Sequence, residues 1–348
     1  MIYLDYQSTT SLAPEAFAAM EPWLRDSFAN PHSTHKAGRA AAAAVEVARE
    51  QVAALLPADG RVIFTSGATE AINLGVKGCG LPVAALATEH AAVLDCVGYL
   101  GGAQLEVSEQ GLSVGALEYA GLFAAMLVNN EIGVVQPIAE IAGAVHRAGG
   151  LLLCDAVQGY GRIPIPAGPD LIAISAHKVH GPKGIGALWV RNGLTLEPLI
   201  HGGGQEQGLR SGTLSPALCA GFGAAAALAA AQMDQDHAHV GILWQHAVVR
   251  FSDWTINGST THRYRGNLNI RRDGVDAARL ISECREIMFS AGSACASGSG
   301  RPSHVLRAIG LSDAQARSSI RLGFGRYTTI EEIEIAAETI NRAAEAMQ

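Results

Sequence analysis

The chain has 348 residues and a net charge of −7, and nearly half of its residues are hydrophobic. Because 25 Lys and Arg stand against 32 Asp and Glu, the charge balance argues against nucleic acid as the main partner. The chain is too apolar to be disordered, and it is long enough for one large domain and a smaller one.

No membrane or targeting segment is predicted. The longest run of small and apolar residues, 221–231, is well short of the roughly 20 residues that a membrane span requires, and residues 1–5 lack the basic start of a secretory signal. Six cysteines are scattered without metal-site spacing, as is typical of free thiols in a reducing compartment. We therefore expect a cytoplasmic protein with no disulfide framework and no metal site. The cysteines are Cys79, Cys96, Cys154, Cys219, Cys284 and Cys295.

Short apolar runs alternate with helical patterns from about residue 61 to residue 190. This alternation is typical of a mostly parallel sheet with helices on both faces. Two long helices are expected around it, over residues 40–55 and 216–233. Seven strands are predicted, at residues 62–65, 82–86, 105–107, 122–128, 151–154, 171–175 and 187–190.

From about residue 250 the pattern changes to a smaller α+β unit. It is predicted to contain strands at residues 268–270 and 320–324, a helix at 275–284 and a closing helix at 330–347. We expect a small domain made of residues 1–15 and 250–348 and a large domain made of residues 16–249. The predicted fold class is therefore α/β, with a seven-stranded mostly parallel sheet and an additional α+β domain.

Polar residues at the carboxyl ends of the predicted strands are the first candidates for function, because ligands bind there in open parallel sheets. Residues 66–70 (Ser-Gly-Ala-Thr-Glu) open a helix whose free N–H groups suit a phosphate, although an ordinary helix start is the commoner explanation. Asp155 ends a strand that is otherwise apolar, and a buried carboxylate requires a cation or several donors. Lys178 follows the sixth strand, where a solvated surface lysine is the usual alternative.

These three features together match what pyridoxal phosphate (PLP) requires of a protein. In this interpretation Lys178 forms the Schiff base, Asp155 keeps the ring nitrogen protonated and Thr69 binds the phosphate. The acid matters most, because a protonated ring withdraws electrons from the substrate Cα. His90, after the second strand, is placed to lie over the ring and transfer protons, although alone it would be read as a satisfied polar residue.

Three further polar side chains are candidate ligands of substrate or ring. Asn130 ends the fourth strand and is placed to donate to a substrate carboxylate or to the ring oxygen, although Asn is also common in turns. Gln158 follows Asp155 by three residues and is placed to donate to the same oxygen. Arg321 lies in an apolar strand, where a guanidinium either grips the carboxylate of an amino acid or forms a structural ion pair, with about equal weight for the two explanations.

Cys295 lies among small residues in Ser-Ala-Cys-Ala-Ser-Gly-Ser-Gly (293–300). A thiol in such a segment packs against little and is predicted to be a nucleophile or a redox-sensitive group. Cys154 and Cys219 lie in apolar surroundings and are expected to be inert.

Five motifs together resemble the cysteine desulfurases of the class V aminotransferase group, and the resemblance extends over nearly the whole chain. They are Thr-Ser-Gly-Ala-Thr-Glu (65–70), Val-Asn-Asn-Glu-Ile-Gly (128–133), His177-Lys178 followed by Gly-Pro-Lys-Gly (181–184), Arg-Ser-Gly-Thr (210–213) and Ser-Ala-Cys (293–295). The resemblance implies the PLP fold type I and a homodimer in which each site is completed by the partner subunit.

The resemblance also implies roles for individual residues. It implies phosphate contacts, ring contacts, a grip on the substrate carboxylate and a persulfide carrier. The phosphate contacts would come from Ala68, Thr69, Ser175 and His177, with Thr213 of the partner subunit. The ring contacts would come from His90, Asp155 and Gln158. Asn130 and Arg321 would hold the substrate carboxylate, and Cys295 would carry the persulfide. Three departures stand out: Ala176 replaces the more frequent glycine, Gln207 replaces the usual arginine, and the tail that some relatives use to dock a scaffold protein is missing.

The function expected from these observations is that of a cysteine desulfurase, which converts L-cysteine to L-alanine and leaves the sulfur on Cys295 as a persulfide. The sulfur would serve iron-sulfur cluster assembly or thiolation through a sulfur-acceptor or scaffold protein. The alternative is a PLP-dependent selenocysteine lyase or aminotransferase in which Cys295 is idle. A dinucleotide-binding module is disfavoured because G-x-G-x-x-G is missing from the first strand–helix unit. A catalytically silent protein is disfavoured by the joint presence of Lys178, Asp155 and Cys295.

Overall fold

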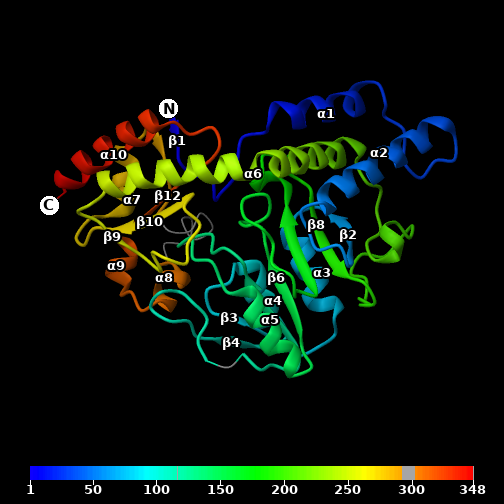
Figure 1. Ribbon diagram of the computed structural model, residues 1–348, viewed down its shortest axis with the longest axis horizontal. Helices are drawn as coiled ribbons and strands as arrows, with labels where there is room; N and C mark the ends of the chain where they lie inside the picture. The colour runs from blue at the N-terminus through cyan, green and yellow to red at the C-terminus, as the bar shows by residue number, and fades with distance from the viewer. Residues whose placement is uncertain (116, 292–301, 348) are drawn as a thin grey trace.

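The computed structural model describes residues 1–115, 117–291 and 302–347 (Figure 1). Its largest element is a seven-stranded sheet with strand order β2-β8-β7-β6-β5-β3-β4, in which β8 alone runs antiparallel to its neighbours. The seven predicted strands are therefore confirmed, with shifts of a few residues at their ends. They are β2 (Gly60–Thr65), β3 (Val83–Leu86), β4 (Ala103–Leu105), β5 (Leu122–Met126), β6 (Leu151–Asp155), β7 (Leu171–Ser175) and β8 (Gly186–Arg191).

Both faces of this sheet are covered, which is why its central strands are apolar at consecutive positions. In β5, Leu122 and Ala124 point to one core and Phe123 and Ala125 point to the other. The first core contains residues of α3 (Ala68–Gly78) and α4 (Ala91–Tyr99). The second contains residues of α2 (Lys36–Ala53), α5 (Ile138–Arg147) and α6 (Pro216–Arg250).

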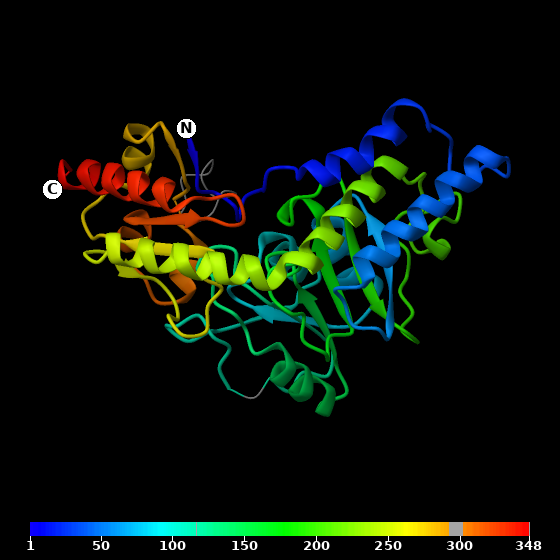
Figure 2. The same cartoon turned by 45° about the horizontal axis from the view of Figure 1, so that its top comes forward.

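Helix α6 is much longer than the sequence predicted and joins the two halves of the molecule (Figures 1 and 2). The predicted end at residue 233 was wrong because polar residues around Asp236 interrupt the apolar pattern. Beyond them Val240, Leu243 and Ala247 form a new buried face, and the helix packs against α10 (Ile330–Glu345) as well as α2 and α1 (Pro14–Arg25).

By length and composition alone, α6 is long and apolar enough to cross a membrane. In this fold many of its apolar residues are buried in the hydrophobic core on one face of the sheet. Asp236 in its middle forms a 2.6 Å ion pair with Arg326. The long helix is thus accounted for by packing in a globular protein.

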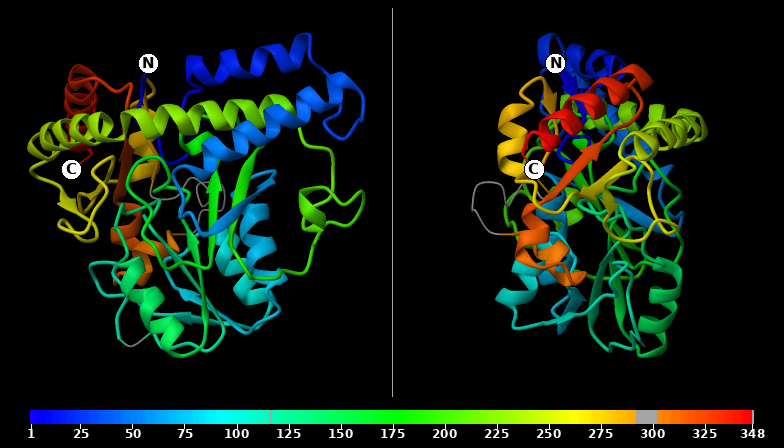
Figure 3. Two further views of the ribbon diagram at one scale, coloured as in Figure 1. Left: turned by 45° about the vertical axis from the view of Figure 1, so that its right-hand side comes forward. Right: turned by 90° about the vertical axis from the view of Figure 1, so that its left-hand side faces the viewer.

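The chain start lies beside the C-terminal part of the sequence (Figure 3). Strand β1 (Ile2–Tyr3) pairs in parallel with β11 (Ile287–Met288), and β10 (Asn267–Arg271) pairs antiparallel with β9 (Thr255–Ile256) and β12 (Ser319–Gly323). The exact division into two domains stays a prediction. The remaining helices of this part are α7 (Ala277–Glu283), α8 (His304–Ala308), α9 (Asp313–Arg317) and α10, of which α7 and α10 match predicted helices.

Phe222 tests the contact between α6 and the sheet. Its buried ring lies 6.4 Å from the ring of Phe64 and 6.1 Å from that of Tyr160. Phe222→Ala should lower the free energy of unfolding by about 3–5 kcal/mol, because it opens a cavity that the sheet cannot fill. The measurement is urea unfolding followed by circular dichroism. Val249→Ala, on the exposed side of the same helix, should change the value by less than about 0.5 kcal/mol, and equal losses in the two variants would contradict this assignment.

Candidate functional site

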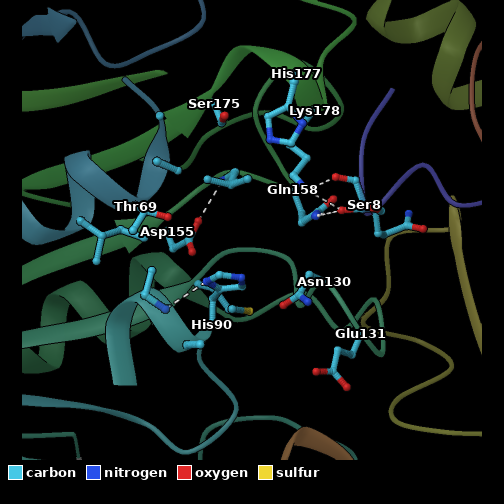
Figure 4. A pocket seen from close by; sticks show the side chains of 18 of the residues that line it. Ser8, Thr69, His90, Asn130, Glu131, Asp155, Gln158, Ser175, His177 and Lys178 are labelled. Atoms are coloured by element: carbon cyan, nitrogen blue, oxygen red, sulfur yellow. Dashed lines mark hydrogen bonds between the residues drawn. The ribbon is translucent and has the colours of Figure 1, made fainter. Parts of the chain in front are cut away.

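A cavity of about 810 Å³ lies at the carboxyl ends of the parallel strands (Figure 4). Of the twelve residues predicted for the site, the structure brings ten together around this cavity. Thr213 does not line it, and lies exposed on the loop between β8 and α6. Cys295 lies outside the described residues. The ten are Ala68, Thr69, His90, Asn130, Asp155, Gln158, Ser175, His177, Lys178 and Arg321.

The start of α3 forms one wall of the cavity. Gly67 precedes the helix, and no side chain of the described residues caps the first N–H groups. Such a helix start, with its positive dipole end, favours an anion. Glu70 accepts the N–H of Ser66 at 2.7 Å and pairs with Arg210 at 2.7 Å. Burial alone would raise the pKa of Glu70, but the bonds from Arg210 and Ser66 outweigh it and lower that pKa.

Lys178 faces the cavity from the turn that follows β7. Its Nζ donates to the carbonyl oxygens of Gln7 at 2.7 Å and Ser8 at 2.6 Å (Figure 4). Burial, together with the charges of Arg162 and Arg321, lowers the pKa of Lys178 from 10.5 to about 8. The alternative of a solvated surface lysine is therefore wrong. An amine with this pKa is largely neutral in mildly alkaline solution, where it acts as a nucleophile and a base.

Asp155 ends β6 and is only 5% exposed. Its Oδ1 accepts the N–H of Val157 at 3.0 Å, and within the described residues no Lys or Arg forms an ion pair with it. Burial raises the pKa of Asp155, and the nearby charges of His90 and Lys178 work against this rise. A buried carboxylate that no Lys or Arg neutralises suits a ligand that brings positive charge of its own.

His90 lies beside Asp155 in the cavity (Figure 4). Its Nδ1 accepts the N–H of Ala92 at 3.1 Å at the start of α4. This bond leaves the proton of the neutral imidazole on Nε2. His177 lies on the turn before Lys178 and contacts Thr9 through Nδ1 at 3.1 Å. Burial and the charge of Lys178 lower the pKa of His177 to about 4, so its ring is neutral near pH 7.

Arg321 satisfies part of both explanations drawn from the sequence. Its Nη2 pairs with Asp5 at 2.7 Å and its Nη1 donates to the carbonyl oxygen of Asn130 at 2.9 Å, so a structural ion pair does exist. The side chain also lines the cavity, and its buried Nε has no acceptor among the described residues. A guanidinium has five N–H donors, so Arg321 retains donors for a ligand besides those that bond Asp5 and Asn130.

The sequence missed several residues of this site. Gln7 and Ser8 reach the cavity from the chain start, and His304 reaches it from α8. Glu131 is buried, accepts a hydrogen bond from Ser303, and has a pKa raised by burial. The position of Glu131 directly after Asn130 was the only sequence signal for any of them, because the other three come from segments distant in sequence from the strand ends.

The cavity fits PLP in three independent respects. Within the described residues, it offers a helix start without a side-chain cap for a phosphate, a buried acid that no Lys or Arg pairs with for a ring nitrogen, and a lysine of lowered pKa for an aldehyde. All three face one space of suitable size.

Comparison with known proteins agrees with this geometry. The sequence model of the family described as "Aminotransferase class-V" matches residues 2–335. The chain belongs to the class V aminotransferase family. This family is PLP-dependent, so PLP is the cofactor of the chain.

Individual members of the class V aminotransferase family are similar over almost the entire chain. The "Cysteine desulfurase IscS" of Rickettsia akari (strain Hartford) is 42% identical, over 97% of this chain and 90% of its own length. The solved structure of a NifS-like protein from Rickettsia africae ESF-5 is 29% identical with a TM-score of 0.91, and 99% of each chain is covered. SspA, solved in complex with cysteine, is 33% identical with a TM-score of 0.83, over 94% of this chain and 100% of its own.

The lowered pKa of Lys178 predicts a pH-dependent stability. The folded cofactor-free chain loses this proton near pH 8 and the unfolded chain near 10.5, so the unfolded state binds more protons in this window and stability rises with pH. From pH 7 to pH 10, wild type should therefore gain about 2–3 kcal/mol in free energy of unfolding relative to Lys178→Met.

Urea unfolding of the cofactor-free proteins at both pH values measures this gain. Lys36→Met, at the exposed start of α2, is the matched control and should keep a constant difference from wild type. A constant difference for Lys178→Met as well would show that the amine has an ordinary pKa.

Proposed function

We propose that this protein is a PLP-dependent cysteine desulfurase, which converts L-cysteine to L-alanine and transfers the sulfur to Cys295 as a persulfide. The observation that carries the proposal is the meeting of Lys178, Asp155 and the start of α3 around one cavity that also contains Arg321. The relatives named cysteine desulfurase, at about 40% identity, and the cysteine complex of SspA support the choice of substrate.

Bound PLP supplies an electron sink for the α-carbon of an amino acid. The chain's own residues prepare the site for this chemistry. Asp155 is suited to hold a proton on a ring nitrogen, because among the described residues no Lys or Arg pairs with its buried carboxylate. Lys178, as a neutral amine, takes a proton from the substrate α-carbon and returns one. Arg321 and Asn130, which both line the cavity, are suited to hold the substrate carboxylate.

The sulfur step requires a thiolate. The thiolate of Cys295 attacks the substrate sulfur, an S–S bond forms, and the Cβ–S bond breaks. The electron pair of the broken bond stays on Cβ, which takes up a proton and becomes the methyl group of alanine. The other five cysteines are free thiols whose pKa is raised by burial, to about 12 for Cys219, so they are poor nucleophiles.

The proposal includes a homodimer in which Thr213 of the partner subunit completes the phosphate site. Its support is the exposure of Thr213 on a loop that Arg210 connects to Glu70 at the start of α3. We further propose a cytoplasmic protein that delivers its sulfur to an acceptor or iron-sulfur scaffold protein. The free thiols of the described cysteines and the names of the IscS relatives support this setting.

Assays with L-cysteine test the activity. The purified protein should release alanine, and with a thiol reductant it should release sulfide in equal amount. Lys178→Ala and Cys295→Ala should each lower alanine formation by about 10²-fold or more, because one removes the base and the other the sulfur acceptor. Cys219→Ala, which removes a buried thiol, should retain activity.

Alanine formation that is unchanged in Cys295→Ala would remove this thiol from the mechanism. Turnover of selenocysteine with Cys295→Ala as active as wild type would favour the lyase, and formation of a keto acid would favour the aminotransferase.

Thr213→Ala tests the dimer. We expect the protein to sediment as a dimer, and the variant to bind PLP about ten- to a hundredfold more weakly, because a hydrogen bond to a charged phosphate contributes about 1.5–3 kcal/mol. Titration of the cofactor-free protein with PLP gives the affinity. Thr255→Ala, at an exposed position of β9, is the control. A monomer with full PLP affinity would contradict the shared site.

A further inference from the structure

Arg162 is a cation outside the main cavity that contacts two residues of the cofactor site, Gln158 and Lys178. It does not line the main cavity, and no Asp or Glu forms an ion pair with it in the part of the chain that the structure describes. Its guanidinium lies 5.6 Å from the ring centre of Tyr264. Burial lowers the pKa of Arg162. A cation held in this way without an acid has a cost in stability, so its other contacts require an explanation.

The guanidinium joins three segments of the chain. Nη1 donates to Oε1 of Gln158 at 2.8 Å, in the turn after β6. Nη2 donates to the carbonyl oxygen of Lys178 at 2.7 Å, in the turn after β7, and to that of Tyr6 at 3.3 Å, near the chain start. Two of these partners, Gln158 and Lys178, line the cavity.

The bond to Gln158 decides which way the amide of that residue points. A guanidinium has donors only, so it selects the oxygen of the amide and turns the NH₂ group away from itself. That NH₂ group donates to the carbonyl oxygen of Gln7 at 2.9 Å and retains a second N–H. Without Arg162 the amide could rotate by 180° and present an acceptor instead of a donor.

The bond to Lys178 fixes the backbone of the residue whose amine reacts. The same carbonyl oxygen of Gln7 accepts Nζ of Lys178 and Nε2 of Gln158. Arg162 therefore acts on a connected set of groups. The charges that act on the amine are those of Arg162, Arg321, Asp5 and Asp155, and Arg162 contributes positive charge without adding a ligand to the cavity.

We propose that Arg162 is a positioning residue of the cofactor site, which orients the amide of Gln158 as a donor and fixes the backbone of Lys178 through one guanidinium. The inference rests on the proposed function, because it assigns the oriented groups to PLP. Lysine in place of Arg162 keeps the charge but loses the planar fork that reaches both acceptors.

The first experiment measures the amine in the cofactor-free, full-length protein. Labelling of Lys178 by trinitrobenzenesulfonate is followed against pH by peptide mass spectrometry, with exposed Lys36 as internal reference. Arg162→Met should raise the apparent pKa of Lys178 by roughly one unit, because a nearby like charge is removed. Labelling near pH 7 should then fall roughly tenfold. Arg162→Lys, which keeps the charge, should restore the wild-type pH profile.

The second experiment is a double-mutant cycle on PLP affinity. Gln158→Ala and Arg162→Lys should each weaken PLP binding roughly tenfold, and the double variant should lose clearly less than the product of the two single losses, because Arg162 acts in part through Gln158. Arg263→Lys is the matched control. Arg263 is also partly buried and donates to backbone carbonyl oxygens, including those of Ser259 and Asn267, and this variant should bind PLP as wild type does.

Additive losses in the cycle, or a wild-type labelling profile in a folded Arg162→Met, would overturn the proposal. If Arg162→Met does not fold, the lysine variant and the cycle still decide the matter. If wild type binds no PLP, the proposed function fails. In that case the proposal for Arg162 fails with respect to PLP, while the labelling profile still reports whether Arg162 acts on the Lys178 amine.

Discussion

The parallel pairing of β3, β5, β6 and β7 is the constraint on which the site depends. Because these strands run in one direction, the residues that follow them meet at one edge of the sheet. Asp155 and Lys178 come from adjacent strands, β6 and β7, and His90 and Asn130 follow β3 and β5. Residues far apart in the sequence therefore share a cavity without any long loop to carry them there.

Burial disfavours the charged forms of the titratable groups in this cavity, and the bound cofactor offsets that cost. Burial raises the pKa of Asp155 and lowers that of Lys178, so each group is pushed toward its neutral form. Glu89, fully buried next to the site, also has a raised pKa, through burial and the charge of Asp155. A ligand with a cationic ring gives Asp155 a partner of opposite charge, and an aldehyde reacts with Lys178 in its neutral form. Binding of the cofactor to the folded chain therefore raises the free energy of unfolding, which the buried groups lower in the cofactor-free chain.

The sequence predicted the features that depend on local pattern. Seven apolar runs predicted the seven strands, and the residue types at their ends, Arg321 within a later strand and the family resemblance together identified ten residues that meet in the cavity. Features that depend on packing were missed. Helix α1 has Pro22 in its interior, a residue that usually ends or kinks a helix. The second half of α6 was missed because its buried face is formed only against the C-terminal part of the chain.

The contacts that orient the site residues could not be predicted from a sequence pattern, for a different reason. Arg321 and Asp5 are separated by 316 positions, and Lys178 and Gln7 by 171. These contacts exist because β1 pairs with β11 and thereby places residues 5–8 between the two parts of the fold. No local signal marks a segment that serves through its carbonyl oxygens, because every residue has one. The residue types at the strand ends thus predict the chemistry of the cavity, whereas the directions in which Lys178 and Arg321 point depend on contacts with the chain start.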